Sequence, residues 1–229
     1  MAVVLPVYND ESRIERAIKS VQAQSFMSWH LFVIDDGSKD KSLEVAQAAC
    51  EGDGRCEVIR FGHIGLTACL RFSLDYCTNY KYIARLDSDD WMSRDRLVRQ
   101  LSKAASGDYS LLGTDVMMGS RHIHYPASDA QCRVILAGFR PRNPFAHSSV
   151  LLLRSAVVKA GGYGNWKTCQ DLDLFLRMSD LEGSRIGNIS LPLTYRDEHP
   201  GQVSRKAWQR RWDSYRIKIN HQLPVWARR

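Results

Sequence analysis

Three aspartates directly after a short apolar run constrain this 229-residue chain more than any other feature. The run spans residues 82–86, and Asp87, Asp89 and Asp90 follow it. Carboxylates at this density repel one another, and at the end of a buried strand they would destabilise the fold unless a cation or hydrogen-bond donors neutralised them. In an extended segment, Asp87 and Asp89 point to the same side of the chain.

These residues alone allow two interpretations of the cluster. Two hard oxygen ligands on one side of a strand end suit Mg²⁺ or Mn²⁺, which take their remaining ligands from water and substrate phosphates. Alternatively, the cluster is a polar loop in which Asp89 or Asp90 caps a helix that begins near Ser93. The other motifs shift the balance toward the metal site.

Short apolar runs alternate with amphipathic segments through the first half of the chain. This alternation predicts an α/β protein with a mostly parallel, Rossmann-like central sheet and helices on both of its faces. We expect strands at residues 3–9, 31–34, 57–61 and 82–86, and helices after residue 9, at 41–50 and at 64–77. Asn9 or Asp10 can cap the first helix. The apolar face of that helix is expected at Ile14, Ala17, Ile18 and Val21.

Acidic residues follow two of these strands, at positions 35–36 and 87–89. In open sheets of this kind, ligands gather at the carboxyl ends of the strands. Both acidic clusters should therefore open into one crevice.

The second half of the chain is less regular and predicts a smaller, mixed region. We expect strands at 111–114 and 150–153, a hairpin at 116–125 around Gly119 and Ser120, a flexible loop at 161–164 and a helix at 170–178.

Composition excludes several classes of protein. Residues 205–229 carry eight basic residues and one acidic residue, so this tail accounts for the whole net charge of +7. A nearly neutral body argues against a broad nucleic-acid-binding face.

No segment approaches the roughly 20 apolar residues of a membrane-spanning helix. Because a strand is expected to begin at Ala2, we expect no signal peptide and a cytoplasmic protein. The six cysteines include no Cys-x-x-Cys pair, so we expect reduced cysteines and no zinc site.

Six motifs resemble the successive signatures of family 2 glycosyltransferases, which have the GT-A fold. They are residues 4–9 (VLPVYN), 35–38 (DDGS), 85–90 (RLDSDD), 143–150 (NPFAHSSV), 170–177 (QDLDLFLR) and 195–199 (YRDEH). Each motif alone is weakly specific, but the six occur in the order of the family over about residues 2–204. The resemblance implies a GT-A domain at 1–204, with a nucleotide-binding half at 1–114 and an acceptor-binding and catalytic-base half at 115–204. It also implies inverting transfer of a sugar from a nucleotide-sugar, expected to be a UDP-sugar, to an acceptor hydroxyl.

The resemblance assigns the nucleotide-sugar site to the first half. Asp89, the last residue of the Asp-x-Asp motif, would bind Mn²⁺ or Mg²⁺, which stabilises the departing diphosphate as a Lewis acid. Asp87 would face the ribose hydroxyls or the water shell of the metal, and Asp36 would accept a hydrogen bond from the base. The base and ribose pocket would be lined by Pro6, Val7 and Tyr8. Arg85 either pairs with the diphosphate or neutralises the acidic cluster.

The resemblance assigns the catalytic base to Asp171, which would take the acceptor proton. The family usually has Glu-Asp here, whereas this chain has Gln170 before Asp171, so one neighbouring charge is lost. Without the resemblance, Asp171 and Asp173 would be charge complements at a helix start. His199 matches a histidine that can complete metal coordination or contact the diphosphate, and solvation is its alternative. His147 is expected to line the donor or acceptor pocket, or to be a satisfied core histidine.

Two positions depart from the family. His63 stands where the family often has an asparagine, and Arg71 replaces a second asparagine a little further on. These departures leave the details of nucleotide contact open.

The basic tail at 205–229 predicts an amphipathic helix. One face of this helix would carry an aromatic and apolar stripe of Trp208, Trp212, Tyr215 and Ile219. The basic residues Arg210, Arg211, Arg216 and Lys218 would lie outside this stripe. Such a helix either lies on an anionic membrane, where a lipid-linked saccharide acceptor would be found, or packs on the domain with a solvated basic face. The segment QRRW at 209–212 is one residue short of the motif of processive synthases, so we expect addition of one sugar at a time in surface polysaccharide, lipopolysaccharide or glycolipid synthesis.

Two other functions compete with sugar transfer. A nucleotidyltransferase typically carries a Gly-rich, basic first loop, whereas residues 6–11 contain neither glycine nor lysine. A non-enzymatic module that binds membrane or nucleic acid through its tail would not explain carboxylates at the strand ends.

Overall fold

The first strand, β1 (Ala2–Val7), lies between two parallel neighbours in the centre of the sheet. The computed structural model describes residues 1–138, 142–197 and 207–222. Among these, nine strands form one sheet in the order β3-β2-β1-β4-β8-β6-β9-β5, and β7 pairs with β6. The other strands are β2 (His30–Asp35), β3 (Cys56–Arg60), β4 (Tyr82–Arg85), β5 (Asp90–Met92), β6 (Tyr109–Met118), β7 (Arg121–Ile123), β8 (Leu151–Leu153) and β9 (Arg185–Arg196).

The sheet is parallel in its first half and mixed in its second. The strands β3, β2, β1 and β4 run parallel, so their carboxyl ends meet at one edge, as the sequence predicted. Beyond them, β8 is antiparallel to both β4 and β6, β9 is parallel to β6, and β5 is antiparallel to β9. The expected hairpin is formed by β6 and β7.

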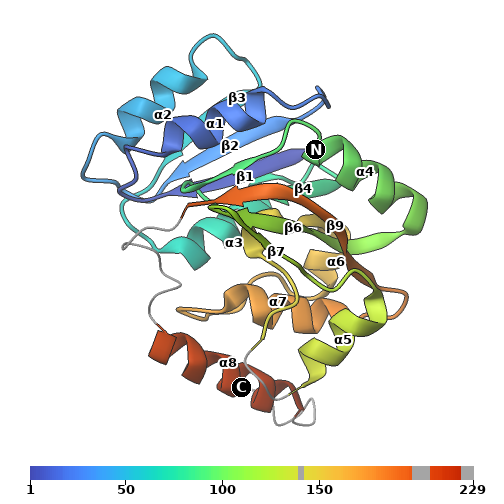
Figure 1. The fold of residues 1–229 in the computed structure, drawn as a ribbon. Helices are drawn as coiled ribbons and strands as arrows, with labels where there is room; N and C mark the ends of the chain where they lie inside the picture. Colours follow the sequence, from blue (N-terminus) through green and yellow to red (C-terminus); the bar gives the residue numbers. More distant parts are fainter. Residues whose placement is uncertain (139–141, 198–206, 223–229) are drawn as a thin grey trace.

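Helices cover both faces of the sheet (Figure 1). Those on one face are α1 (Ile14–Gln22), α2 (Ser42–Cys50) and α4 (Arg96–Gly107); on the other lie α3 (Leu66–Tyr76), α6 (Arg154–Lys159) and α7 (Gln170–Ser179), with α5 (Asp129–Ala137) and α8 (Ala207–Gln222) further from the sheet. Because side chains alternate along a strand, β1 contributes to two cores. Val3 and Leu5 belong to the core under α1 and α2, whereas Val4 belongs to the core that contains Leu70 of α3 and Phe175 of α7.

The first helix confirms its predicted face but not its predicted cap. The residues Ile14, Ala17, Ile18 and Val21 are fully buried. No side chain caps the helix, however, and the position before it is Arg13. Asn9 instead adopts a left-handed conformation with φ of 52°, and its side-chain oxygen accepts a hydrogen bond from the backbone N–H of Lys39 at 2.8 Å. The predicted cap was wrong because Asn9 joins two loops rather than starting a helix.

The loop interpretation of the aspartate cluster is also wrong. Helix α4 begins at Arg96, three residues later than the Ser93 start that we expected, and no side chain caps it. Asp90 lies in β5, where it pairs with Arg196 of β9. Strand β5 has only three residues, too few for a periodic signal.

The sequence also failed to predict β9, α5 and α6. The twelve residues of β9 include Pro192, and the pairing of β9 with β6 shifts register around Asp115. A proline and a bulge interrupt the alternation by which a strand is recognised. Helix α6 has six residues, too few for a clear helical period.

In the described part of α8, the predicted stripe of the C-terminal helix faces largely toward solvent. Trp212 and Ile219 are exposed by 54% and 53%, while Ile217 and Lys218 are buried. The ammonium of Lys218 donates to the carbonyls of Ile135 at 3.0 Å and Gly138 at 2.6 Å, at the end of α5. Cations are stabilised at a helix carboxyl end, so this polar anchor, and not the aromatic residues, selects the packed face. The side chain of Trp208 lies outside the described residues.

Candidate active site

A cleft of ≈ 660 Å³ lies at the carboxyl ends of the central strands. It is lined from the first half by Pro6, Val7, Tyr8, Asp36, His63, Gly65, Leu66, Asp87, Ser88 and Asp89, and from the second half by Tyr125, Asn143, Phe145, Ala146, His147, Ser148, Lys167, Thr168, Cys169, Gln170, Asp171 and Arg196. The two acidic clusters of the first half therefore open into one cavity, together with Asp171.

Most of the predicted site residues line this cleft. The exceptions are Arg85, which lies beneath it, and His199, which lies outside the described residues. Asp173 does not line the cleft either. It pairs with Arg177 one helical turn later in α7, at 2.5 Å, which is the structural alternative that the sequence allowed.

The aspartates after β4 form a group that fits a divalent cation. One carboxylate oxygen from each of Asp87, Asp89 and Asp90 lies within 4.8 Å of the others. The side chain of Asp90 is completely buried, and among the described residues neither of its oxygens accepts a well-aligned hydrogen bond, although Nε of Arg196 lies 3.3 Å from one of them. Burial raises the pKa of Asp90 to about 8, and the neighbouring carboxylates of Asp87 and Asp89 add to this, although Arg196 opposes it. Mg²⁺ or Mn²⁺ at this position would coordinate carboxylate oxygens that lack hydrogen bonds and would relieve the repulsion between the three carboxylates.

A buried guanidinium supports the acidic group from below. Arg85 is 1% exposed, and it donates to an oxygen of Asp87 and to the carbonyl of Val4, both at 2.7 Å. Burial opposes the ionisation of Asp87, yet Arg85 and other nearby cations hold the pKa of Asp87 below its ordinary value. Of the two interpretations of Arg85, this geometry favours neutralisation of the acidic cluster.

Arg196 is a cation of the cleft that we did not single out from the sequence. Its Nε lies 3.3 Å from an oxygen of Asp90, and its side chain lines the cavity. Burial works against its charge, but Asp90 and Asp87 raise its pKa. The residue stands in the closing motif 195–199, so its position carried a signal, but only β9 brings it to the aspartates.

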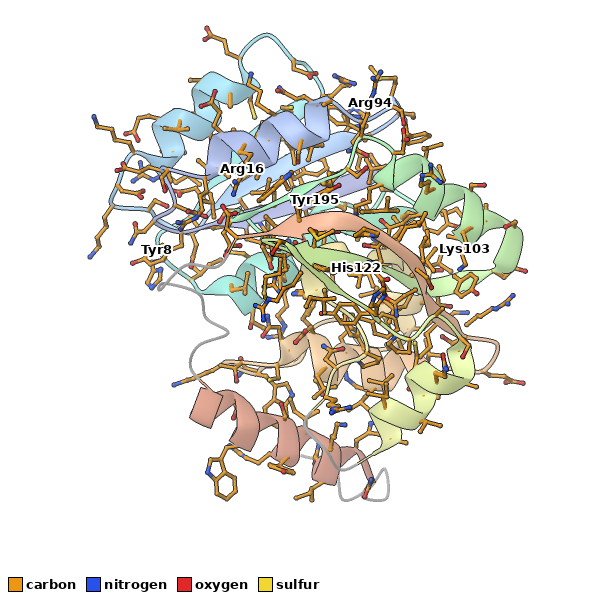
Figure 2. The ribbon with its side chains drawn as sticks, in the orientation of Figure 1. Tyr8, Arg16, Arg94, Lys103, His122 and Tyr195 are labelled. Atoms are coloured by element: carbon orange, nitrogen blue, oxygen red, sulfur yellow. The ribbon has the colours of Figure 1, made fainter. Side chains whose placement is uncertain are left out.

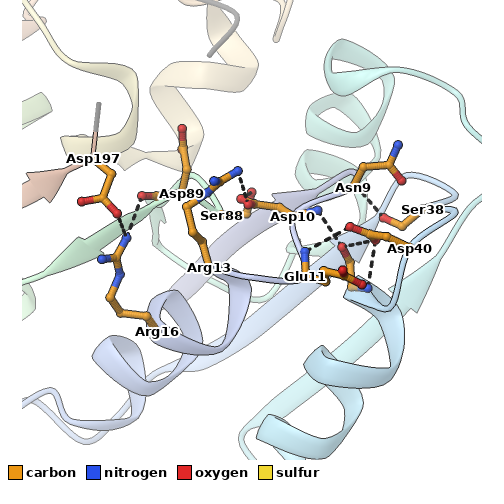
Figure 3. A network of polar contacts seen from close by, with 11 residues as sticks. Asn9, Asp10, Glu11, Arg13, Arg16, Ser38, Asp40, Ser88, Asp89 and Asp197 are labelled. Atoms are coloured by element: carbon orange, nitrogen blue, oxygen red, sulfur yellow. Dashed lines mark hydrogen bonds and ion pairs between the residues drawn. The ribbon is translucent and has the colours of Figure 1, made fainter. Parts of the chain in front are cut away.

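The turn that carries the acidic group is tied to the first helix. Ser88 Oγ donates to Asp10 Oδ2 at 2.6 Å, and Arg13 pairs with the other oxygen of Asp10 at 2.5 Å. Arg16 donates to the carbonyl of Asp89 at 3.3 Å and also pairs with Asp197, as Figure 3 shows. Figure 2 shows Arg16 and Tyr195 on neighbouring elements, α1 and β9. The acidic turn is thus held from the side opposite to Arg85.

Asp36 holds the loop at residues 63–65, at one end of the cleft. Its carboxylate accepts hydrogen bonds from the backbone N–H groups of Ile64 at 2.6 Å and Gly65 at 3.0 Å. Its second oxygen accepts from the N–H of Gly65 at 3.0 Å and lies 3.2 Å from Nδ1 of His63, so the loop contacts both carboxylate oxygens. Gly37 is required here, because a Cβ on it would lie 2.6 Å from the backbone nitrogen of His63.

Tyr8 and His63 form an aromatic platform at the same end. Their rings stack with centroids 4.3 Å apart and an angle of 26° between their planes. Tyr8 is exposed by 41%, so the platform is open to a ligand. His63 has a φ of 54°, in the left-handed region in which asparagine and histidine are enriched. The histidine can therefore replace the asparagine of the family without changing the backbone.

Asp171 opens α7 on the other side of the site. Its Oδ2 accepts a hydrogen bond of 2.7 Å from the side-chain amide nitrogen of Asn143, and the side-chain oxygen of Asn143 accepts from the backbone N–H of Phe145 at 3.1 Å. Asn143 therefore fixes the position of the carboxylate. It belongs to the motif 143–150, but we did not predict this contact from the sequence. Gln170 precedes Asp171 and is nearly buried.

The imidazole of His147 is neutral and contacts the hydroxyl of Tyr163. Burial lowers its pKa to about 4, and its Nε2 lies 3.0 Å from the hydroxyl of Tyr163. It also lines the cleft, so the structure combines the two interpretations that the sequence left open.

The model of the family named Glycosyl transferase family 2 matches residues 2–146, and the chain belongs to this family of glycosyltransferases. The O-antigen biosynthesis glycosyltransferase WbnJ of Escherichia coli is similar to it, with 24% identity over 200 residues that cover 83% of this chain and 76% of WbnJ. Asp171 and Arg196 lie beyond the matched family segment.

Two solved structures share the fold, which is the GT-A fold. TarS 1-349 of S. aureus in complex with UDP-GlcNAc superposes with a TM-score of 0.77 and 15% identity, covering 97% of this chain and 67% of that chain. The mannosyltransferase PcManGT of Pyrobaculum calidifontis, in complex with GDP-Man and Mn²⁺, has a TM-score of 0.71 and 16% identity and covers 97% of this chain and 64% of that chain.

Proposed function

We propose that this glycosyltransferase moves one sugar at a time from a nucleotide-sugar to an acceptor hydroxyl, with inversion and with a divalent cation. The observation that carries the proposal is that one cleft is lined both by Asp87 and Asp89, two members of the acidic group, and by Asp171. The first can bind a cation next to a diphosphate, and the second can accept a proton. Their union in one cavity is what an inverting transfer requires.

Asp89 is the proposed metal ligand, with Asp87 beside it. Mn²⁺ or Mg²⁺ held there would stabilise negative charge on the departing diphosphate. The complex of PcManGT with Mn²⁺ supports a metal of this kind. A role of His199 as a further ligand stays a prediction.

The nucleotide would occupy the end of the cleft that contains Tyr8. Pro6, Val7 and Tyr8 would line the base and ribose pocket, and Asp36 would accept a hydrogen bond from the base. The ring of His63 stacks on one face of Tyr8, so a base would lie against the other face. We propose a UDP-sugar donor, which the UDP-GlcNAc complex of TarS supports, although PcManGT binds GDP-Man.

Arg196 joins the proposed diphosphate site. Its guanidinium is permanently charged and lines the cleft beside the acidic group. A planar guanidinium can donate two parallel hydrogen bonds to phosphate oxygens. Arg85 keeps Asp87 ionised from beneath, so the two arginines would have different tasks.

Asp171 is the proposed base. The hydrogen bond from Asn143 fixes one oxygen, which leaves the other to receive the proton of the acceptor hydroxyl. Gln170 and His147 would line the pocket for the transferred sugar and the acceptor. By its chemistry the acceptor would be a saccharide or a lipid-linked saccharide in polysaccharide, lipopolysaccharide or glycolipid synthesis, which the name of WbnJ supports.

The basic tail is a proposed contact with the membrane that would carry such an acceptor. In the described part of α8, Trp212, Arg216 and Ile219 are exposed, which is the composition of a helix at an anionic interface. None of the helices in the described ranges is long and apolar enough to cross a bilayer. A cytoplasmic location, at the inner face of the membrane, is part of this proposal.

A thermal-shift experiment tests the function. The chain is heated with UDP, GDP, dTDP or CDP, each with and without Mn²⁺, because a ligand of the folded state raises the apparent melting temperature. We expect one nucleotide to stabilise the chain only when metal is present. No shift with any nucleotide would contradict the proposal. Release of pyrophosphate from a nucleoside triphosphate would favour a nucleotidyltransferase instead.

A further inference from the structure

Two histidines face one buried aspartate on the β6–β7 hairpin, outside the acidic group of the cleft. Nε2 of His122 lies 2.9 Å from Oδ2 of Asp115, and Nδ1 of His124 lies 3.0 Å from the same oxygen. The two imidazole rings are 3.8 Å apart between centroids. His122 is labelled in Figure 2, and it lies in β7, opposite Met117 of β6.

Two features of the backbone bring these three side chains together: a register shift in β6 and the β6–β7 hairpin. Asp115 lies where the pairing of β6 with β9 shifts register, and such a bulge re-aims a side chain. His122 lies in β7 and His124 directly follows its last residue, so the two side chains, two residues apart, project to the same side of the extended chain. The hairpin places this side against Asp115.

The carboxylate of Asp115 is already oriented for binding. Its Oδ1 accepts a hydrogen bond of 2.8 Å from the backbone N–H of Tyr125, which leaves Oδ2 to the two imidazoles. Asp115 itself is completely buried, whereas the side chains of His122 and His124 are exposed by 32% and 71%. The group is therefore rigid at its base and open to solvent at its top.

We propose that Asp115, His122 and His124 bind a divalent transition-metal cation, with Zn²⁺ as the best fit. The three ligand atoms lie within 4.8 Å of one another. Neighbouring ligands of tetrahedral zinc lie about 3.3 Å apart for bonds of about 2.0–2.1 Å. The nitrogen–oxygen distances of 2.9 Å and 3.0 Å need to widen by only a few tenths of an ångström. The cation would replace the protons that now join the two rings to Asp115.

The donor set separates this site from the acidic group of the cleft. Two imidazoles and one carboxylate suit zinc and its neighbours, whereas an all-oxygen group suits Mg²⁺ and Mn²⁺. The site also departs from our sequence prediction of no zinc site, which considered only cysteines. Tyr125 follows His124 and lines the cleft, so a cation here would fix one wall of the acceptor-side region.

Titration of the untagged, chelator-treated chain with ZnCl₂ tests this site by calorimetry. We expect the wild type to bind one more equivalent of Zn²⁺ than H122Q/H124Q. The loss of affinity should exceed the roughly 10–100-fold that removal of an outer-shell partner produces. Because these histidines are partly exposed, the variant should keep its fold, which far-UV circular dichroism checks. H124Q alone, at the more exposed position, is the reserve variant.

Two controls separate this cation from other zinc binding. H30Q removes an exposed histidine elsewhere and should bind as much Zn²⁺ as the wild type. D89N removes a ligand of the cleft group and should also keep the zinc equivalent. Co²⁺ should give the visible absorption of a tetrahedral site in the wild type and in D89N but not in H122Q/H124Q. Equal zinc binding by wild type and H122Q/H124Q, or none by the wild type, would overturn the proposal.

Discussion

The side-chain amide of Asn143 donates a hydrogen bond of 2.7 Å to the carboxylate of Asp171. The two residues are 28 positions apart, and both line the cleft. A donor that fixes a carboxylate also fixes the direction from which that carboxylate can accept a proton. Asn143 is therefore a positioning residue for the proposed base.

Asp171→Asn should abolish turnover and spare nucleotide binding. A positioned base contributes about 10²–10⁴-fold to rate, so kcat should fall in that range, while the dissociation constant for the nucleotide should stay within about twofold. Steady-state kinetics and calorimetry measure the two quantities. Full activity of Asp171→Asn would remove the base assignment.

Asn143→Ala should lower kcat by up to about 100-fold, because misplacement of a reacting group by about 1 Å has effects of that size. The KM for the donor should change little, since Asn143 would act through Asp171. Combined with Asp171→Asn, the substitution should have no further effect on kcat. Additive losses would mean that Asn143 acts independently of Asp171.

Asp89→Ala should abolish the metal-dependent part of nucleotide binding. The matched control is Asp173→Ala, a nearby aspartate that pairs with Arg177 and does not line the cleft. Thermal shift with and without Mn²⁺ distinguishes them. If Asp89→Ala kept the full metal-dependent shift, the cation would have to be bound elsewhere.

The stability of the metal-free chain should fall as pH rises from about 4 to about 8, in part because of Asp90. Its folded pKa of about 8 is above the ordinary aspartate value, so between about pH 4 and 8 the folded state binds more protons than the unfolded state. The slope from this one group is at most about 1.4 kcal/mol per pH unit. Asp90→Asn should flatten the profile, and so should saturating Mn²⁺ in the wild type. Denaturant unfolding between pH 5 and pH 9 measures this, and an unchanged slope in Asp90→Asn would count against it.

Tyr8→Ala should weaken nucleotide binding more than Tyr8→Phe. Loss of a stacked ring removes about 1–3 kcal/mol of base stacking, whereas phenylalanine retains the ring. His63→Ala should have a smaller effect in the same direction, because His63 supports the platform from behind Tyr8. Calorimetric titration with the nucleotide is the measurement. Equal affinities for Tyr8→Ala and Tyr8→Phe would show that no base lies on the ring.

The sequence predicted the first half of the chain better than the second half. The elements up to β4 have regular periods, and the motifs around Asp36 and Asp87 stand at strand ends that sequence alone can locate. The contacts of Asn143, Arg196 and Asp115 could not be predicted in this way. Each depends on β6 or β9, or on a loop between short elements, where a bulge, a proline and a three-residue strand remove the periodic signal.

The tail shows a second kind of limit. Its aromatic spacing correctly indicated a helix, but the packed face was chosen by the Lys218 ammonium on the last carbonyls of α5. Lys218→Met should therefore lower the free energy of unfolding by about 1–3 kcal/mol, because buried carbonyls lose their donor. Arg216→Met, on the exposed face, should change it by less than about 0.5 kcal/mol.

The acidic turn is fixed at both of its ends. Arg85 of β4 bonds to Asp87 before the turn, and after it the strand β5 pairs with β9. A cation that arrives there meets ligands already in place and does not have to order the turn around itself. Binding energy that would otherwise go into ordering remains available for affinity. It follows that steps in other parts of the chain, and not a rearrangement of this turn, would limit the rate of the proposed catalytic cycle.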